Sequence, residues 1–160
     1  MKILDDTLLE TLIATAGGLP RLRTHHNLHQ ELSDPVQRLV VSVAPGTYIQ
    51  PHRHPAPKWE MILALRGTLT LVFFDTAGTI QQRLTLAAGG PVTAVEIPPG
   101  SLHTLFPGAD SAAFLEMKPG PYAPSGPEDF AEWAPSEGDA AVAAFQDWLK
   151  TAAPGDHFKH

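Results

Sequence analysis

Three histidines and one glutamate have the residue types and spacing of a metal site. His52 and His54 are two residues apart, so on an extended segment both imidazoles point to the same side. Prolines then favour a bend, and Glu60 opens an apolar run that can fold back beside the histidines. His103 follows a Pro-Pro-Gly turn and would arrive from another strand. Three imidazoles with one carboxylate favour a borderline divalent metal: Fe, Mn, Co, Ni, Cu or Zn.

Four protein ligands on an octahedral metal would leave two positions for water or substrate, which metal-assisted catalysis requires.

The composition of the chain excludes several other kinds of site and partner. The chain has no cysteine, which excludes thiolate zinc sites, Fe–S clusters and cysteine nucleophiles. Its 11 Lys and Arg against 17 Asp and Glu give a net charge of −6, which argues against a nucleic-acid or anionic-membrane partner. We therefore expect a small-molecule ligand.

Short apolar runs separated by turn residues predict that residues 37–120 form an all-β core. Regular spacing of this kind is typical of a sandwich or barrel and not of βαβ units. Residues 75–78 predict a hairpin loop. The expected strands are 38–44, 60–66, 68–74, 79–87, 92–97 and 111–118, with a further strand starting near His103.

The flanking segments predict one helix at each end of a single domain. Asp5 or Asp6 can cap a helix that ends at Gly17-Gly18, and a second amphipathic helix is expected over residues 139–151. We interpret residues 19–37 as a loop or extended arm, 119–138 as a surface loop, and 154–160, with His157 and His160, as a frayed tail. The domain is accordingly divided into an N-terminal helix and arm (1–36), a barrel (37–120) and a C-terminal loop and helix (121–160).

The segments that contain the predicted metal ligands resemble the two sequence motifs of the cupin superfamily. Gly46, His52, His54, Glu60 and Gly67 fill the first motif, with five residues between His54 and Glu60 where three or four are usual. The second motif is matched by Pro98, Gly100 and His103, and Pro107 stands where asparagine is usual.

Within the superfamily, residues 3–150 resemble the WbuC-type cupin fold metalloproteins. The likeness rests on segments 35–38, 52–55, 58–60, 65–67 and 118–122. It implies a small double-stranded β-helix or jelly-roll-like barrel with short terminal helices. It also implies one divalent metal on His52, His54, Glu60 and His103, and often a homodimer. Some members occur with bacterial surface-polysaccharide genes.

Further polar side chains are candidates for the substrate pocket. Arg23, His25, Asn27 and His29 on the arm, together with Lys118, are predicted to bind substrate, and a solvated basic loop is the alternative for the arm. The i, i+4 spacing of His25 and His29 also suggests a second metal site.

Two other side chains have the parity of an inward-facing position. Tyr48 lies four residues before His52, so on a regular strand it faces the same interior, as a general acid or base or as a packed aromatic. Glu116 shares parity with Lys118, and the two would form a buried ion pair or bind an anionic ligand.

Three functions remain open at this stage. The first is a metal-dependent enzyme of oxygenase, isomerase or hydrolase type, using Fe, Mn, Ni or Zn on a small polar or anionic molecule such as a sugar derivative or organic acid. The second is a non-catalytic metal-containing binding or sensing module. The third, a metal-free sugar epimerase with a histidine base and tyrosine acid, is disfavoured by the complete ligand set. With no visible signal peptide or membrane-length apolar run, we expect a cytoplasmic protein. Because the exposed edges of a small barrel are commonly covered by pairing, we also expect a homodimer.

Overall fold

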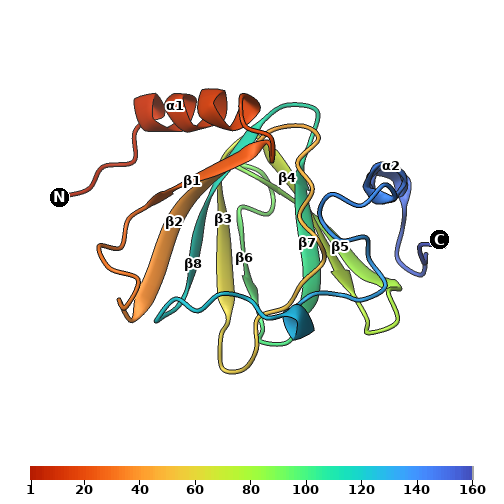
Figure 1. The fold of residues 1–160 in the computed structure, drawn as a ribbon. Helices are drawn as coiled ribbons and strands as arrows, with labels where there is room; N and C mark the ends of the chain where they lie inside the picture. The colour runs from red at the N-terminus through yellow and green to blue at the C-terminus, as the bar shows by residue number, and fades with distance from the viewer. Residues whose placement is uncertain (160) are drawn as a thin grey trace.

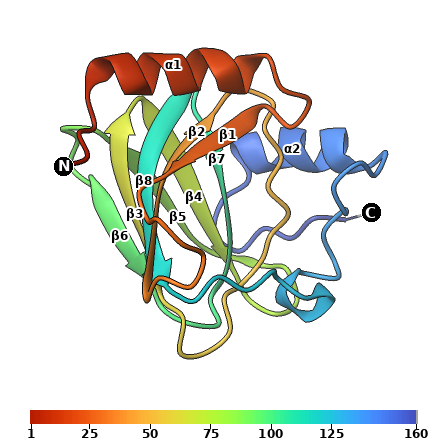
Figure 2. The same cartoon turned by 60° about the vertical axis from the view of Figure 1, so that its left-hand side comes forward.

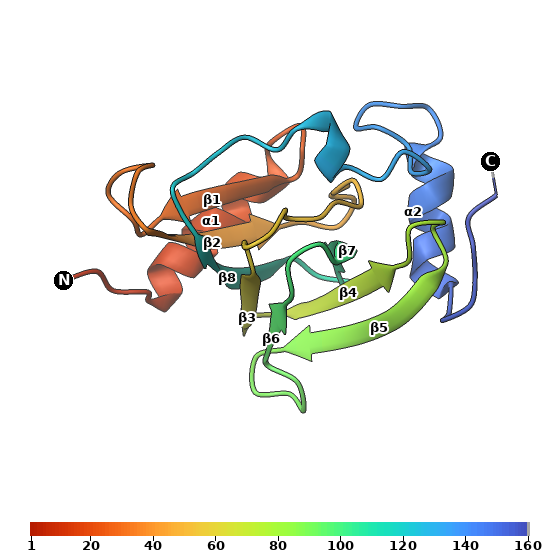
Figure 3. The same ribbon diagram turned by 90° about the horizontal axis from the view of Figure 1, so that it is seen from below.

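Two antiparallel β-sheets face each other, with one helix packed on the outer face of each (Figures 1 and 2). The computed structural model describes residues 1–159. The larger sheet has the order β1-β2-β8-β3-β6 and the smaller one β5-β4-β7, and Figure 3 shows them as opposed layers. The strands are β1 (Arg23–Asn27), β2 (Val36–Val43), β3 (Glu60–Arg66), β4 (Thr68–Phe74), β5 (Ile80–Ala87), β6 (Ala94–Ile97), β7 (Leu102–Pro107) and β8 (Ala112–Pro119).

The main core lies between the sheets because alternate residues of each strand point inward. In β4 the inward residues Leu69 and Leu71 are buried, whereas Thr68 at the start of the strand is exposed. The inward set from both sheets is aliphatic with one aromatic ring: Val43, Ile62, Leu69, Leu71, Leu86, Ile97, Leu105 and Phe114. Burial of this set is the main source of the fold's stability.

Gly67 carries the chain from the larger sheet into the smaller one. Its φ of +72° lies in the left-handed region, and a Cβ there would be 2.7 Å from the carbonyl oxygen of Ser111. The one-residue connection therefore needs glycine for both conformation and space. It fixes the ends of β3 and β4 at the residues that the sequence pattern predicts.

The helices bury apolar faces on the outer sides of the sheets. Helix α1 (Asp6–Gly17) is capped by Asp5, whose carboxylate accepts from Leu8 N at 2.9 Å. Its residues Leu9 and Leu12 pack against the outer face of the larger sheet. Helix α2 (Val142–Thr151) packs Phe145 and Leu149 on the smaller sheet, three residues shorter at its start than predicted. A short 3-10 turn, η1 (Pro127–Asp129), interrupts the preceding loop.

The terminal segments are more ordered than the sequence suggested. Part of the extended arm is strand β1, which adds to the larger sheet with Arg23 opposite Val43. The prediction of a frayed tail is wrong for residues 154–159, because Gly155 N donates to Ile80 O and Phe158 packs on Phe145. His160 lies outside the described residues. Within residues 1–159, no helix is long and apolar enough to cross a membrane.

Candidate metal centre

The four predicted ligands come from three separate segments that meet at one end of the sandwich. Glu60 is the first residue of β3, and His103 is the second residue of β7. His52 and His54 lie in the connection between β2 and β3. His52 and His103 form an antiparallel bridge in which each backbone N–H donates to the other residue's carbonyl oxygen, at 2.9 and 2.8 Å. The backbone itself therefore places these two imidazoles side by side.

Backbone hydrogen bonds from the C-terminal loop and the Pro-Gly turn hold the other side of the histidine segment. Ala131 N donates to Pro51 O at 2.9 Å, and Arg53 N donates to the carbonyl oxygen of Asp129 at 2.8 Å. Gly100 N donates to the carbonyl oxygen of His54 at 2.8 Å. The contribution of residues 129–131 does not follow from the sequence, because a segment rich in proline and glycine carries no periodicity that predicts such pairing.

The side chains converge as tightly as the spacing predicted. One ligand atom from each of His52, His54, Glu60 and His103 lies within 4.8 Å of all the others. His103 Nε2 is 3.0 Å from Glu60 Oε2, and His54 Nε2 is 3.2 Å from Glu60 Oε1. Glu60 is 4% exposed and His103 is 1% exposed, so the carboxylate and this imidazole are shielded from bulk water.

Hydrogen bonds to the far nitrogen fix the tautomer of two of the rings. Nδ1 of His52 lies 3.0 Å from Gln50 O, and Nδ1 of His103 lies 2.9 Å from Ser101 O. A carbonyl oxygen only accepts, so each Nδ1 must carry a proton, and a neutral ring then turns the lone pair of Nε2 toward the cluster. At 3.0 Å, His103 Nε2 faces a carboxylate oxygen of Glu60, a contact that either a bound cation or a proton on this nitrogen satisfies.

The residues fit a divalent metal. His54 Nε2 is buried and makes no hydrogen bond, although it points at the same carboxylate. Burial lowers the pKa of His52 to about 3, so its ring is neutral and able to coordinate. Burial alone would raise the pKa of Glu60, but His103, His54 and Lys118 hold it well below its usual range. Imidazoles around an ionised carboxylate are the donor set of a borderline divalent ion.

A cavity of about 430 Å³ opens onto the cluster from between the sheets. Of the residues predicted to bind substrate, Arg23, His25 and Lys118 line it together with His52, Glu60 and His103. Its remaining wall is formed by Arg21, Thr24, Leu39, Val41, Ile49, Ile62, Leu105, Phe114 and Glu116.

Asn27 and His29 do not line this cavity, which differs from the prediction. Asn27 is exposed at the end of β1, opposite Leu39. His29 is buried beyond the strand, and its Nδ1 accepts from Arg38 N at 3.1 Å. Because β1 is a strand, the helical spacing of His25 and His29 does not hold. Residues 1–159 contain one group of at least three metal-ligating side chains, the His52 cluster.

Glu116 and Lys118 point inward together from β8, as their parity predicted. Lys118 Nζ lies 2.6 Å from Glu116 Oε1 and 3.6 Å from Glu60 Oε1, with the Lys118 side chain 23% exposed. Burial would lower the pKa of Lys118, but the two carboxylates raise it above its usual value. Burial and the nearby charge of Glu60 raise the pKa of Glu116. The cavity thus holds an ammonium group beside a predicted metal ligand.

Tyr48 does not face the metal cluster. Its hydroxyl donates to the carbonyl oxygen of Pro135, and its ring packs edge-on against Phe145 at 6.0 Å between centroids. Burial raises the pKa of Tyr48 above its usual value, so the phenol stays protonated. The prediction of an inward direction assumed a regular strand, but residues 44–51 adopt none and the alternation is lost. The geometry favours the alternative interpretation of Tyr48 as a packed aromatic.

Tyr48→Phe is expected to leave metal content unchanged and to lower the free energy of unfolding by about 1–3 kcal/mol, because Pro135 O loses its buried donor. Elemental analysis and urea unfolding of the variant would check both. Loss of metal from a folded Tyr48→Phe protein would show that Tyr48 does contribute to the metal site.

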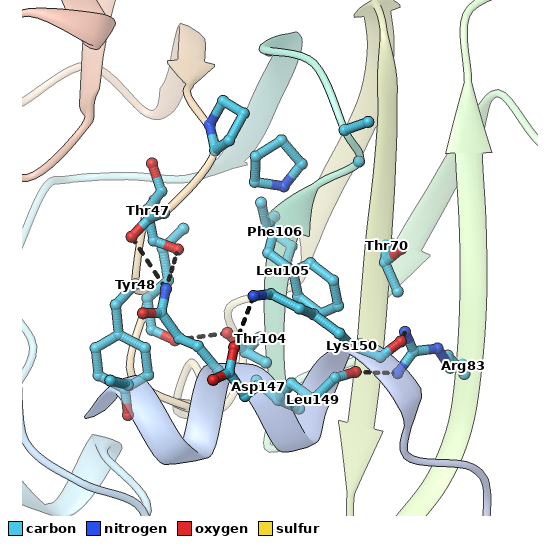
Figure 4. Close-up of a pocket in the computed structure, with 18 residues that line it drawn as sticks. Thr47, Tyr48, Thr70, Arg83, Thr104, Leu105, Phe106, Asp147, Leu149 and Lys150 are labelled. Carbon is cyan, nitrogen blue, oxygen red and sulfur yellow. Dashed lines mark hydrogen bonds and ion pairs between the residues drawn. The ribbon is translucent and has the colours of Figure 1, made fainter. Parts of the chain in front are cut away.

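A second and larger hollow, of about 600 Å³, lies between α2 and the outer face of the smaller sheet (Figure 4). Its polar groups are already paired: Gln146 donates to the carbonyl oxygens of Gly46 and Thr47, and Arg83 donates to Leu149 O. Lys150 pairs with Asp147 in the same view. The contacts of Arg83 and Gln146 dock α2 on the smaller sheet and on the loop after β2, so these polar groups hold the helix in place and are not aimed at a ligand.

Comparison with known proteins places the chain in a family. A family model described as "Domain of unknown function (DUF6016)" matches residues 4–86. The chain belongs to this family. The matched region runs from α1 to β5 and includes His52, His54 and Glu60. No curated protein matches the chain in sequence.

Solved structures show the fold. The TT1209 protein from Thermus thermophilus is 22% identical with a TM-score of 0.54, covering 74% of this chain and 97% of that one. An oxalate oxidase in complex with the substrate analogue glycolate is 21% identical with a TM-score of 0.53, covering 74% and 62%. A cupin superfamily protein from Desulfitobacterium hafniense DCB-2 is 22% identical with a TM-score of 0.47, covering 61% and 76%. The predicted all-β fold is confirmed.

Proposed function

We propose that this chain is a cupin metalloprotein that binds one divalent metal through His52, His54, Glu60 and His103. The observation that carries the proposal is the direction of the ring nitrogens. Two rings donate from Nδ1 to backbone carbonyls, and His103 Nε2 then meets Glu60 Oε2 at 3.0 Å. A protein that used these groups only to pack its core would not leave the buried Nε2 of His54 without a hydrogen bond.

We propose further that the protein is an enzyme that acts on a small polar or anionic molecule, a sugar derivative or an organic acid. A divalent metal at this site supplies Lewis acidity toward a carbonyl or activates water or dioxygen. Arg23, His25 and Lys118 would bind and orient the molecule in the cavity, and the apolar wall would exclude bulk water. The oxalate oxidase likeness supports small-molecule chemistry at such a fold.

The finer parts of the proposal rest on sequence resemblance. Segments 52–55 and 58–60 support membership of the WbuC type, with a link to surface-polysaccharide chemistry. Imidazole and carboxylate ligands suit Fe, Mn, Ni or Zn alike. We also propose a cytoplasmic homodimer, for which light scattering coupled to size-exclusion chromatography should return twice the chain mass of 17.2 kDa.

Removal of the metal is expected to destabilise the protein. An ion that binds only the native state at about 1,000 times its Kd contributes about 4 kcal/mol, so treatment with a chelator should lower the thermal midpoint and added metal should restore it. Differential scanning calorimetry of protein purified without chelator or nickel resin would measure the shift. An unchanged midpoint, with no metal in the purified protein, would contradict the metal site.

The catalytic and non-catalytic versions of the proposal are separated by what happens to bound molecules. The metal-loaded protein is incubated with organic acids and sugar derivatives, and the mixture is followed by NMR. Conversion of one compound supports an enzyme. A compound that binds at the metal and is recovered unchanged supports the binding or sensing module and contradicts the enzyme.

A further inference from the structure

Apart from the predicted metal ligands, four side chains of the cavity can carry positive charge, and three of these are accounted for without a ligand. Arg21 binds the carboxylate of Glu137 with two hydrogen bonds of 2.6 Å, and Arg23 reaches the same carboxylate at 3.1 Å. The two guanidinium groups are therefore neutralised in part at the rim of the cavity. Burial lowers the pKa of His25, which leaves that ring neutral near pH 7.

Lys118 is the remaining cation, and it retains capacity to donate. An ammonium group has three N–H donors. Glu116, at 2.6 Å, takes one of them, and Glu60, at 3.6 Å, lies beyond normal hydrogen-bond distance. At least one donor of Lys118 is thus available to a molecule in the cavity, next to the carboxylate predicted to hold the metal.

Six of the other side chains that line the cavity are apolar, and most of its polar side chains are already paired with Glu137 or Lys118 or belong to the predicted metal site. A sugar with many hydroxyl groups would lose hydrogen bonds to water here and find few partners, which is costly in a buried site. A compact hydrocarbon body with one charged end would pack against the same wall without that loss. The apolar side chains concerned are Leu39, Val41, Ile49, Ile62, Leu105 and Phe114.

We infer that the cavity selects a small organic acid, whose carboxylate is bound by Lys118 beside the metal, and that Glu116 is a positioning residue for Lys118. This inference rests on the proposed metal site and narrows its ligand from polar molecules in general to carboxylates. Because Glu116 and Glu60 already offset part of the charge of Lys118, the site accommodates the single charge of a carboxylate better than a phosphate, which carries up to two charges on three oxygens.

Glu116 positions the ammonium group by competing with Glu60 for it. The flexible stem of lysine would otherwise let Nζ approach Glu60, whose nearer oxygen is 3.6 Å away. Such an ion pair would occupy the oxygen atoms that the metal needs. The 2.6 Å contact with Glu116 keeps the ammonium group in the cavity and off the metal ligand.

The experiment uses Co(II)-loaded protein, because the visible absorption of the ion reports ligands that bind to it. The probes are glycolate and its neutral amide glycolamide, which have almost the same shape. Wild type is expected to bind glycolate at least about tenfold more tightly than glycolamide, because one hydrogen bond to a charged group changes the affinity by about this factor or more. Lys118→Met should lose this preference while keeping its cobalt and its glycolamide affinity.

Two further variants and one further probe make the result decisive. Lys118→Arg should keep a preference for glycolate, and Glu116→Gln should weaken glycolate binding with a smaller effect on glycolamide. Equal glycolate affinity in wild type and in folded Lys118→Met would overturn the inference and leave the proposed metal site intact. Tighter binding of inorganic phosphate than of glycolate would do the same. A wild-type protein that takes up no cobalt would overturn both the inference and the proposed metal site.

Discussion

Replacing Glu60 by alanine is expected to weaken metal binding by more than about 100-fold, because even partners that only support a metal ligand are worth about 10–100-fold. Glu60 is the single carboxylate among the four converging groups and is 4% exposed. Its loss removes the negative charge that balances the ion. His52→Ala should act in the same direction by removing one neutral donor. Elemental analysis after dialysis against metal-free buffer measures both effects.

The fold should survive these two substitutions, which separates loss of the site from loss of the protein. The core of the sandwich is apolar and does not depend on the cluster. His26→Ala is the matched control for His52, because His26 is an exposed histidine on β1. Full metal content in folded Glu60→Ala, or an equal loss in His26→Ala, would show that the ion binds elsewhere.

Replacing Phe145 by alanine is expected to lower the free energy of unfolding by about 3–5 kcal/mol, the range for deletion of a buried aromatic ring. Phe145 is fully buried on α2, and its ring contacts the rings of Tyr48, Trp133 and Phe158. Its removal would leave a cavity between the helix, the C-terminal tail and the smaller sheet. Urea or thermal unfolding measures the loss.

Folded Phe145→Ala should still bind the metal, because α2 supplies no ligand. Leu32→Ala is the control, since Leu32 is 55% exposed and its truncation should change the free energy of unfolding by less than about 0.5 kcal/mol. A loss of under about 1 kcal/mol in Phe145→Ala would contradict the packing of α2 and the tail on the sheet.

The strands that form the sandwich could be predicted from local patterns because alternation and turn residues act over a few positions. β3 and β4 begin and end where the sequence analysis placed them, on either side of Gly67. The same local reasoning brought His52 and His54 to one side of the chain, where both meet Glu60 and His103. The convergence of the four side chains could be predicted because their spacing in the sequence matches that of known motifs.

Parity failed for Tyr48, where the backbone leaves the strand geometry. Tyr48 is only four residues from His52, yet the irregular backbone between them turns its ring to the opposite side. Pairing between distant segments was equally invisible: residues 129–131 support the histidine segment through backbone groups, which any sequence possesses. Phe158 joins the core through contacts with Phe145 and Trp148 that no local period predicts.

The most direct measurement is anomalous X-ray diffraction from crystals of protein purified without chelator or nickel resin. We expect one anomalous peak per chain, with Nε2 of His52, His54 and His103 and an oxygen of Glu60 at about 2.0–2.3 Å from it. The absorption edge that produces the peak would identify the ion. A well-ordered site with no peak after soaking in Fe, Mn, Ni and Zn salts, or with Glu60 hydrogen-bonded away from the imidazoles, would contradict the metal centre.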